Sequence, residues 1–114
     1  MTPRRLRDLP TADVLGHGVP VAATRRARLL GLAHLDLEEA GPGLLIPRCA
    51  GVHTFGMRFP LDLVFLDRDG APLSARLALP PRRLAYDRRA RAVLELPSSH
   101  GESVAAGWGA VRRG

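Results

Sequence analysis

Runs of hydrophobic residues along the chain predict a protein made mostly of short β-strands. The clearest signal is two apolar runs, 61–66 and 73–79, separated by Asp67-Arg68-Asp69-Gly70. Asp and Gly favour tight turns and Gly70 is free to adopt a positive φ, so this block predicts a β-hairpin. The second run alternates apolar and polar positions, as a half-buried strand does. The first run is apolar on both faces, which predicts a central or covered strand.

The remaining pattern predicts one helix and several further strands. Thr24 is a suitable N-cap, and residues 25–34 place apolar side chains along one helical stripe. Gly31 weakens the middle of this helix, which could extend through Leu35 to Glu39 before Gly41-Pro42-Gly43 ends it. Strands are also expected at 19–22, 44–46 and 92–96, a helical turn at 102–106 and a closing strand at 108–111.

Two stretches lack this periodicity. Residues 1–18 contain two Pro and two Gly, so we expect an irregular lead-in or tail before a single domain at 19–114. Residues 48–60 are irregular but too apolar for an ordinary surface loop. The strand expected at 92–96 does alternate, with Val93 and Glu95 on one face and the other residues on the opposite face. The predicted class is α+β: mostly antiparallel β, in a small rolled sheet or distorted barrel with one helix in the N-terminal half.

Length and composition set limits on this fold. A chain of 114 residues with 46% hydrophobic residues can bury one core without covalent cross-links. Its apolar stretches fall far short of the roughly 18 residues needed for a membrane-spanning helix, and acidic residues and Pro interrupt the N-terminus where a secretion signal would need an apolar run. The single Cys49 cannot form an intrachain disulfide. We therefore expect a cytoplasmic protein.

The basic charge does not by itself indicate a nucleic-acid partner. The formal charge is +6 with 17 basic residues, all of them Arg, which could neutralise phosphates. However, the arginines occur in scattered groups, only five aromatic residues are present, and none lies in a strand signature that stacks bases. A solvated basic surface therefore explains the charge better, and nucleic-acid binding is not expected.

One segment resembles a known family. The stretch GLLIPRCAGVHTFGMRFPLDLVFLDRDG at 43–70, followed by LALPP at 77–81 and AVLELP at 92–97, resembles the domain of unknown function 192 family of small bacterial and archaeal proteins. The similarity covers about residues 20–111. It implies a compact β-rich fold and no established activity. Many members carry an N-terminal export or tethering segment and a terminal Gly-Asp, whereas this chain has Gly109-Ala110 at the corresponding place.

Asp62 is the most informative single residue. It alternates with apolar residues on a strand that should be covered, and a buried carboxylate is costly unless hydrogen-bond donors surround it. The simplest interpretation is that backbone N–H groups of the loop from His53 to Arg58 donate to Asp62 and fix the loop. The alternatives are that Asp62 lines a pocket as a ligand-binding or acid–base group, or that it is exposed at the start of the strand.

Other candidates surround this residue in the sequence. Cys49, His53 and Asp62 invite comparison with a nucleophile set, which requires the imidazole within hydrogen-bond reach of the sulfur. A free Cys is more often a small buried hydrophobic residue. His53 and Thr54 could form the lip of a pocket, or the loop could simply pack Met57 and its aromatic neighbours into the core. The histidines are scattered singly, so neither a metal site nor a cofactor is predicted.

The leading hypothesis is a non-enzymatic binding or accessory domain with a shallow pocket at the 49–62 loop. Arg48 and Arg58 flank this loop, so the expected ligand is small and polar or anionic, or a peptide. The first alternative is a hydrolase that uses Asp62 with His53 or Cys49. The second is a basic protein that binds nucleic acid or an anionic surface. The sequence does not indicate the oligomeric state.

Overall fold

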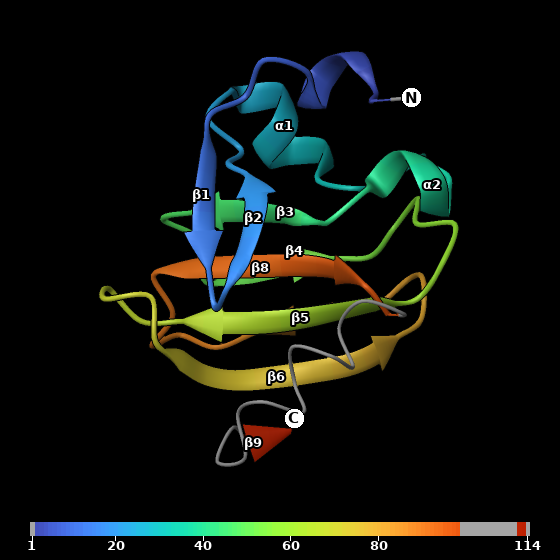
Figure 1. Ribbon diagram of the computed structural model, residues 1–114. Helices are drawn as coiled ribbons and strands as arrows, with labels where there is room; N and C mark the ends of the chain where they lie inside the picture. The colour runs from blue at the N-terminus through green and yellow to red at the C-terminus, as the bar shows by residue number, and fades with distance from the viewer. Residues whose placement is uncertain (1, 99–111, 114) are drawn as a thin grey trace.

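The computed structural model describes residues 2–98 and the backbone of 112–113 (Figure 1). A 3-10 helix, Arg4–Leu6, precedes strands β1 (Thr11–Val14) and β2 (His17–Pro20) and helices α1 (Arg25–Leu30) and α2 (Leu37–Ala40). The later strands are β3 (Leu44–Pro47), β4 (Gly51–His53), β5 (Leu61–Leu66), β6 (Pro72–Leu79), β7 (Leu84–Tyr86), β8 (Ala92–Pro97) and β9 (Arg112–Arg113).

A five-stranded sheet in the order β3-β8-β5-β6-β9 forms the centre of the molecule. Its pairs are antiparallel except for β6 with β9, and two further antiparallel pairs, β1–β2 and β4–β7, lie apart from it. The predicted hairpin is confirmed, since β5 pairs with β6 across residues 67–70, and all six residues of β5 are buried. The α+β class is also confirmed, with an open sheet rather than a closed barrel in the described part of the chain.

The sheet buries both faces, because strand residues alternate between two apolar clusters. The cluster that we call the α1-side core includes Leu32, Leu44, Leu63, Phe65, Ala85 and Val93. The cluster that we call the hairpin-side core consists of Val14, Val19, Val64, Leu66, Leu94 and Leu96. The β1–β2 hairpin thus covers one face, seen in front of the sheet in Figure 1, and α1 with the β4–β7 pair covers the other.

The predicted helix at 25–34 is shorter than expected. Thr24 caps it as predicted, with Oγ1 accepting from the N–H of Ala27 at 3.0 Å, but α1 stops at Leu30. Gly31 takes φ 53° and ψ −128°, which turns the chain out of the helix. Instead of extending α1, the following residues form the separate helix α2, where Glu39 Oε1 accepts from the N–H of Asp36 at 2.9 Å.

The N-terminal stretch is ordered into secondary structure where an irregular lead-in was expected. β1 and β2 form a hairpin through the two-residue turn Leu15-Gly16, both with positive φ. Such a turn ordinarily carries Asn, Asp or Gly at its first position, so Leu15 gave no signal. Within 48–60 and 82–89, the short apolar segments around Val52 and Ala85 pair as β4 and β7. The expected elements at 102–106 and 108–111 lie outside the described residues.

Candidate functional site

Asp62 is buried and supports the sheet. It is 1% exposed, and its Oδ1 accepts a hydrogen bond from the N–H of Ala78 at 2.6 Å. We expected the donor to lie in the loop from His53 to Arg58; this donor instead belongs to β6. The pairing of β5 with β6 shifts register here, and Ala78 has φ 54°, so the carboxylate stabilises an irregularity in the neighbouring strand.

The sheet separates Asp62 from Cys49 and His53. Asp62 lies opposite Leu96 in the β5–β8 pair and therefore belongs to the face with the hairpin-side core. Cys49 packs against the α1-side core on the other face. Its Sγ donates to the carbonyl oxygen of Gly51 at 3.1 Å. The expected combination of Asp62 with His53 or Cys49 in a nucleophile set is therefore not assembled.

Thr54 and Met57 organise the loop rather than line a pocket. Thr54 is fully buried, and its Oγ1 donates to the carbonyl oxygen of Pro80 at 2.7 Å and accepts from the N–H of Arg83 at 2.8 Å. Met57 is 7% exposed and belongs to the α1-side core. Both residues fix the path of the chain between β4 and β5.

The two arginines expected to flank one pocket point to different places. Arg58 forms an exposed ion pair with Asp36, with 2.8 Å between Nη1 and Oδ1. Arg48 lines a separate groove near the tip of the β1–β2 hairpin. An anionic ligand held between Arg48 and Arg58 is therefore not supported by this arrangement.

Cys49 and His53 do share a cavity, and its carboxylate is Glu95. The cavity has a volume of about 160 Å³ and lies between the end of α1 and strand β4. Its walls are largely apolar, with Leu29, Leu30, Ile46 and Val52 among them. Glu95, from β8, is 3% exposed. We call this space the Glu95 cavity.

Backbone and charged groups hold Glu95 in place. Its Oε1 accepts from the N–H of Leu32 at 3.3 Å, in the turn that follows α1. Arg5 braces that turn by donating to the carbonyl oxygens of Gly31 and Ala33. Burial raises the pKa of Glu95 to about 7, against the opposing effects of the Leu32 hydrogen bond and the charge of Arg5. The carboxyl group therefore changes its charge near neutral pH.

Sequence reasoning missed Glu95, although a signal was present. It is the only charged residue in AVLELP, and the alternation in that strand places it with Val93 on the face opposing the other apolar residues. In the structure both faces of β8 are covered, because Val93 packs into the α1-side core and Leu94 and Leu96 pack into the hairpin-side core. Glu95 is, like Asp62, a lone carboxylate in an apolar strand, so its burial could have been predicted in the same way.

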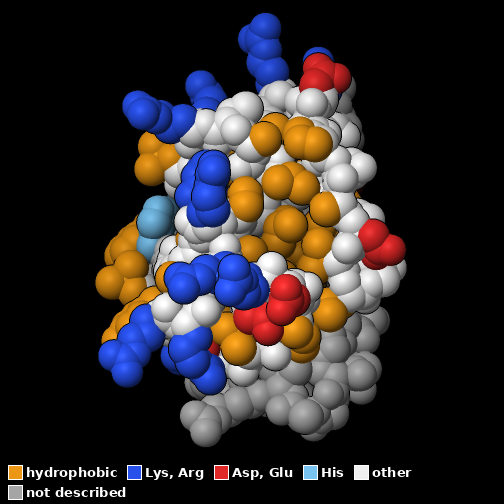
Figure 2. Space-filling view, turned by 90° about the vertical axis from the view of Figure 1, so that its left-hand side faces the viewer, with side chains coloured by type: hydrophobic (Ala, Val, Ile, Leu, Met, Phe, Trp, Pro, Cys, Tyr) orange, Lys and Arg blue, Asp and Glu red, His pale blue; other side chains and the backbone are white. Residues whose placement is uncertain are grey.

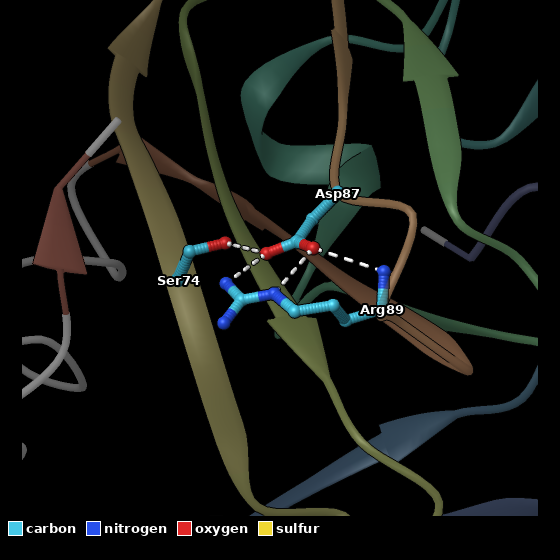
Figure 3. Close-up of polar contacts among 3 residues, drawn as sticks. All are labelled: Ser74, Asp87 and Arg89. Atoms are coloured by element: carbon cyan, nitrogen blue, oxygen red, sulfur yellow. Dashed lines mark hydrogen bonds and ion pairs between the residues drawn. The ribbon is translucent and has the colours of Figure 1, made fainter.

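The partly buried carboxylate of Asp87 is engaged in an ion pair with Arg89. Arg89 donates from Nη2 to Oδ2 of Asp87 at 2.7 Å and from Nε to Oδ1 at 2.9 Å, and Ser74 Oγ donates to Oδ2 at 2.8 Å (Figure 3). These bonds lower the pKa of Asp87 well below its usual range, the Arg89 side chain contributing most. Asp87 thus links Arg89, in the segment between β7 and β8, to Ser74 of β6.

Neither a metal-binding group nor a membrane-spanning helix is found among the described residues. No group of three or more His, Cys, Asp or Glu side chains there is arranged to hold a metal ion. None of the helices in the same part of the chain is long and apolar enough to cross a membrane.

Comparisons with other proteins agree with this fold. The model of the DUF192 family, described as an uncharacterised ACR, matches residues 11–109. No curated protein matches the sequence. A crystal structure from Sinorhizobium meliloti 1021, titled a "putative transcription regulator", is similar with a TM-score of 0.67 and 21% identity, covering 78% of this chain and 74% of that one. A protein of unknown function from Novosphingobium aromaticivorans DSM 12444 is similar with a TM-score of 0.60 and 20% identity, covering 83% and 75%.

Proposed function

The chain belongs to the DUF192 family, and from that premise we propose that it is a non-enzymatic binding domain that docks an acidic segment of a partner protein on the β4–β7 pair. The observation that carries the proposal is a cluster of exposed apolar side chains. Among the described residues, five large hydrophobic side chains are exposed, and four of them gather here. They are Leu29, Phe55, Leu84 and Tyr86, and the fifth, Leu37, lies on α2.

The register of the β4–β7 pair explains why these side chains face outward. His53 lies opposite Leu84, and Gly51 lies opposite Tyr86, while Val52 and Ala85 between them pack into the α1-side core. Alternation along both strands therefore turns Leu84 and Tyr86 away from the core, where they are 75% and 71% exposed. We call this side, with Phe55 and Leu29, the ribbon face.

The ribbon face is continuous with its surroundings at both ends. The rings of His53 and Phe55 lie 5.7 Å apart between centroids, so Phe55 extends the face beyond β4. Leu29 and His53 both line the Glu95 cavity, so the face also reaches the end of α1. Exposed apolar groups that gather in this way mark interaction surfaces, whereas scattered single ones are ordinary. Aromatic residues and Arg are the types enriched at such surfaces.

Charge complementarity favours an acidic partner. Arg82, Arg83 and Arg88 are exposed beside the outward residues of β7. The only acidic residue between 82 and 91 is Asp87, which is held by Arg89 and Ser74 (Figure 3). A partner segment that offers carboxylates around an apolar or aromatic anchor would match both features. The basic charge also disfavours pairing of this face with a second copy of itself.

The proposal is tested by binding of a random copolymer of glutamate and tyrosine to the purified protein, measured by fluorescence anisotropy. The double substitution Leu84→Ser and Tyr86→Ser should weaken binding about tenfold or more, since exposed anchors carry much of such affinity. Both side chains are exposed, so the fold should be kept. Leu37→Ser is the matched control and should bind like the wild type.

Three further results would decide against this proposal. Equal binding by the wild type and the double variant would exclude the ribbon face. Equal binding of polyglutamate would show that charge alone suffices and that the apolar anchors do nothing. Tighter binding of oligothymidylate than of the copolymer would favour the nucleic-acid alternative, with the rings of Phe55 and Tyr86 as stacking surfaces.

A second candidate function, hydrolysis, has one specific observation in its favour. Cys49, His53 and Glu95 all line the Glu95 cavity, and the pKa of Glu95 is near 7, suited to acid–base chemistry. This set replaces the one expected with Asp62. Hydrolysis of p-nitrophenyl acetate that is lost in both Cys49→Ser and Glu95→Gln would support an enzyme. Equal rates in the wild type and both variants would exclude it.

A further inference from the structure

A groove on the far side of the sheet is independent of the ribbon face. It has a volume of about 890 Å³ and lies between the tip of the β1–β2 hairpin and the turn that joins β5 to β6. Figure 2 shows an apolar hollow bordered by arginine side chains, mainly along one side, and by carboxylates. Leu15, Leu45 and Ala92 contribute to its apolar lining, and all three are partly exposed. The volume is in the range that holds a small organic ligand.

Two strained residues line this groove. Leu15 has φ 53° at the hairpin turn, and Arg48 has φ 50° just after β3. Bulky residues rarely adopt this conformation, which costs about 1–2 kcal/mol for each residue and persists only where the surroundings impose it. Arg28 imposes it on Arg48, because its guanidinium donates to the carbonyl oxygens of Pro47 and Arg48. The left-handed conformations of Leu15 and Arg48 place an apolar and a cationic side chain beside the same groove.

The charges around the groove favour an anion. Arg48, Arg68 and Arg91 line it, and none of them forms an ion pair with a residue in the described part of the chain. Asp13, Asp67 and Asp69 also line it. Asp67 is committed to the turn, because its Oδ1 accepts from the N–H groups of Asp69 and Ala71. Because N–H groups are neutral, Asp67 keeps its charge, and the groove is lined by three guanidinium groups and three carboxylates. The preference for an anion rests on the arginine side chains that gather mainly along one side of the hollow (Figure 2) and on the formal charge of +6 of the chain.

We infer that this groove binds a soluble amphiphilic anion, in which an apolar body covers Leu15, Leu45 and Ala92 and a carboxylate or similar head meets the arginines. Guanidinium groups suit such a head because they can donate two parallel hydrogen bonds to it. Burial of the apolar body against the floor would supply the remaining affinity. A membrane surface is not required, since the groove is large enough for a single ligand.

The test uses decanoate below its micelle concentration, titrated by calorimetry against the full chain. Decanoate should bind at least about fivefold more tightly than decylammonium or decanol, because only the anion engages the arginines. Leu15→Asn should weaken decanoate binding while leaving the fold intact, since Asn is favoured at this turn position. Arg91→Ser should also weaken it, and Arg25→Ser, on the exposed side of α1, should not.

Each contrary result has a defined meaning. Decylammonium that binds as tightly as decanoate would overturn the assignment of an anion. Unchanged binding in Leu15→Asn and Arg91→Ser would overturn the assignment to this groove. Decanoate binding that appears only together with sedimentation on phosphatidylglycerol vesicles would replace the soluble ligand with a membrane. The double substitution Leu84→Ser and Tyr86→Ser should leave decanoate binding unchanged, which separates this inference from the proposed function.

Discussion

A Cβ atom on Gly31 would lie 2.6 Å from Oε1 of Glu95, so the turn after α1 passes directly against a buried carboxyl group. Gly31 also has a positive φ, which a larger residue adopts only with strain. We expect Gly31→Ala to lower the free energy of unfolding by about 2–4 kcal/mol, because it combines a steric clash with backbone strain. Urea denaturation measures this change.

Gly18→Ala provides the matched control for that experiment. A Cβ atom on Gly18 would meet no atom within 4 Å, and the residue does not have a positive φ. The substitution should change stability by less than about 0.5 kcal/mol, as exposed substitutions usually do. Similar losses in both variants would show that the approach of Gly31 to Glu95 is unimportant.

Glu95 should make the protein less stable as the pH rises toward neutrality. Its pKa is about 7 in the folded protein and about 4.5 ordinarily, so between these values the folded state binds more protons than the unfolded state. Stability from this group is therefore fully present below about pH 4.5, falls between pH 4.5 and 7, and is constant above. The total loss should be about 2–4 kcal/mol.

Glu95→Gln should remove this slope, since the amide oxygen can still accept from Leu32 and carries no charge. Urea denaturation of both proteins from pH 4.5 to 8 tests the prediction. Asp87 does not interfere, because its lowered pKa places its loss of stability at acid pH, below this window. Parallel pH profiles for the two proteins would contradict the assignment of the slope to Glu95.

The sequence was sufficient for the elements with strong periodicity. The β5–β6 hairpin and β8 followed from apolar runs bounded by Asp-Gly and Pro, and the buried state of Asp62 followed from its alternation with Val64 and Leu66. These features depend on local pattern, which the sequence displays directly.

The remaining features depend on contacts between distant segments. The Glu95 cavity requires α1, β4 and β8 to meet, and the turn that supplies the Leu32 N–H is braced by Arg5, from a stretch expected to be irregular. The β1–β2 turn uses Leu15 where turn chemistry favours Asn or Gly. The local pattern could have indicated that Glu95 is buried. The cavity around Glu95 and the β1–β2 turn depend on tertiary packing, which local patterns do not display.

Thr54 should be important for stability rather than for binding. Thr54→Val keeps the shape of the side chain but removes the hydroxyl that bonds Pro80 and Arg83. We expect a loss of about 1–3 kcal/mol, because a partly buried carbonyl and a partly buried N–H would lose their partner. Thr54→Ser, which retains the hydroxyl, should lose clearly less. Equal losses in thermal or urea denaturation would indicate that packing, and not hydrogen bonding, makes Thr54 important.

Asp62 should stabilise the domain through Ala78. Asp62→Ala removes the acceptor of the Ala78 N–H and should cost about 1–3 kcal/mol, as expected when a partly buried donor loses its partner. If urea denaturation shows a lower free energy of unfolding with an unchanged slope against urea concentration, the loss is assigned to the folded state. A variant as stable as the wild type would contradict the structural role of this carboxylate.

Ala78→Gly should have the opposite effect at the same irregularity in β6. Ala78 has φ 54°, and its left-handed conformation costs about 1–2 kcal/mol, whereas Gly adopts it freely. Gly also loses about 0.5–1 kcal/mol more conformational entropy on folding, so a net gain of about 0.5–1 kcal/mol is expected. Ala71→Gly, at an exposed position without a positive φ, should instead lose stability slightly. A loss of stability in Ala78→Gly of the same size as in Ala71→Gly would mean that Asp62 does not hold β6 in a strained conformation.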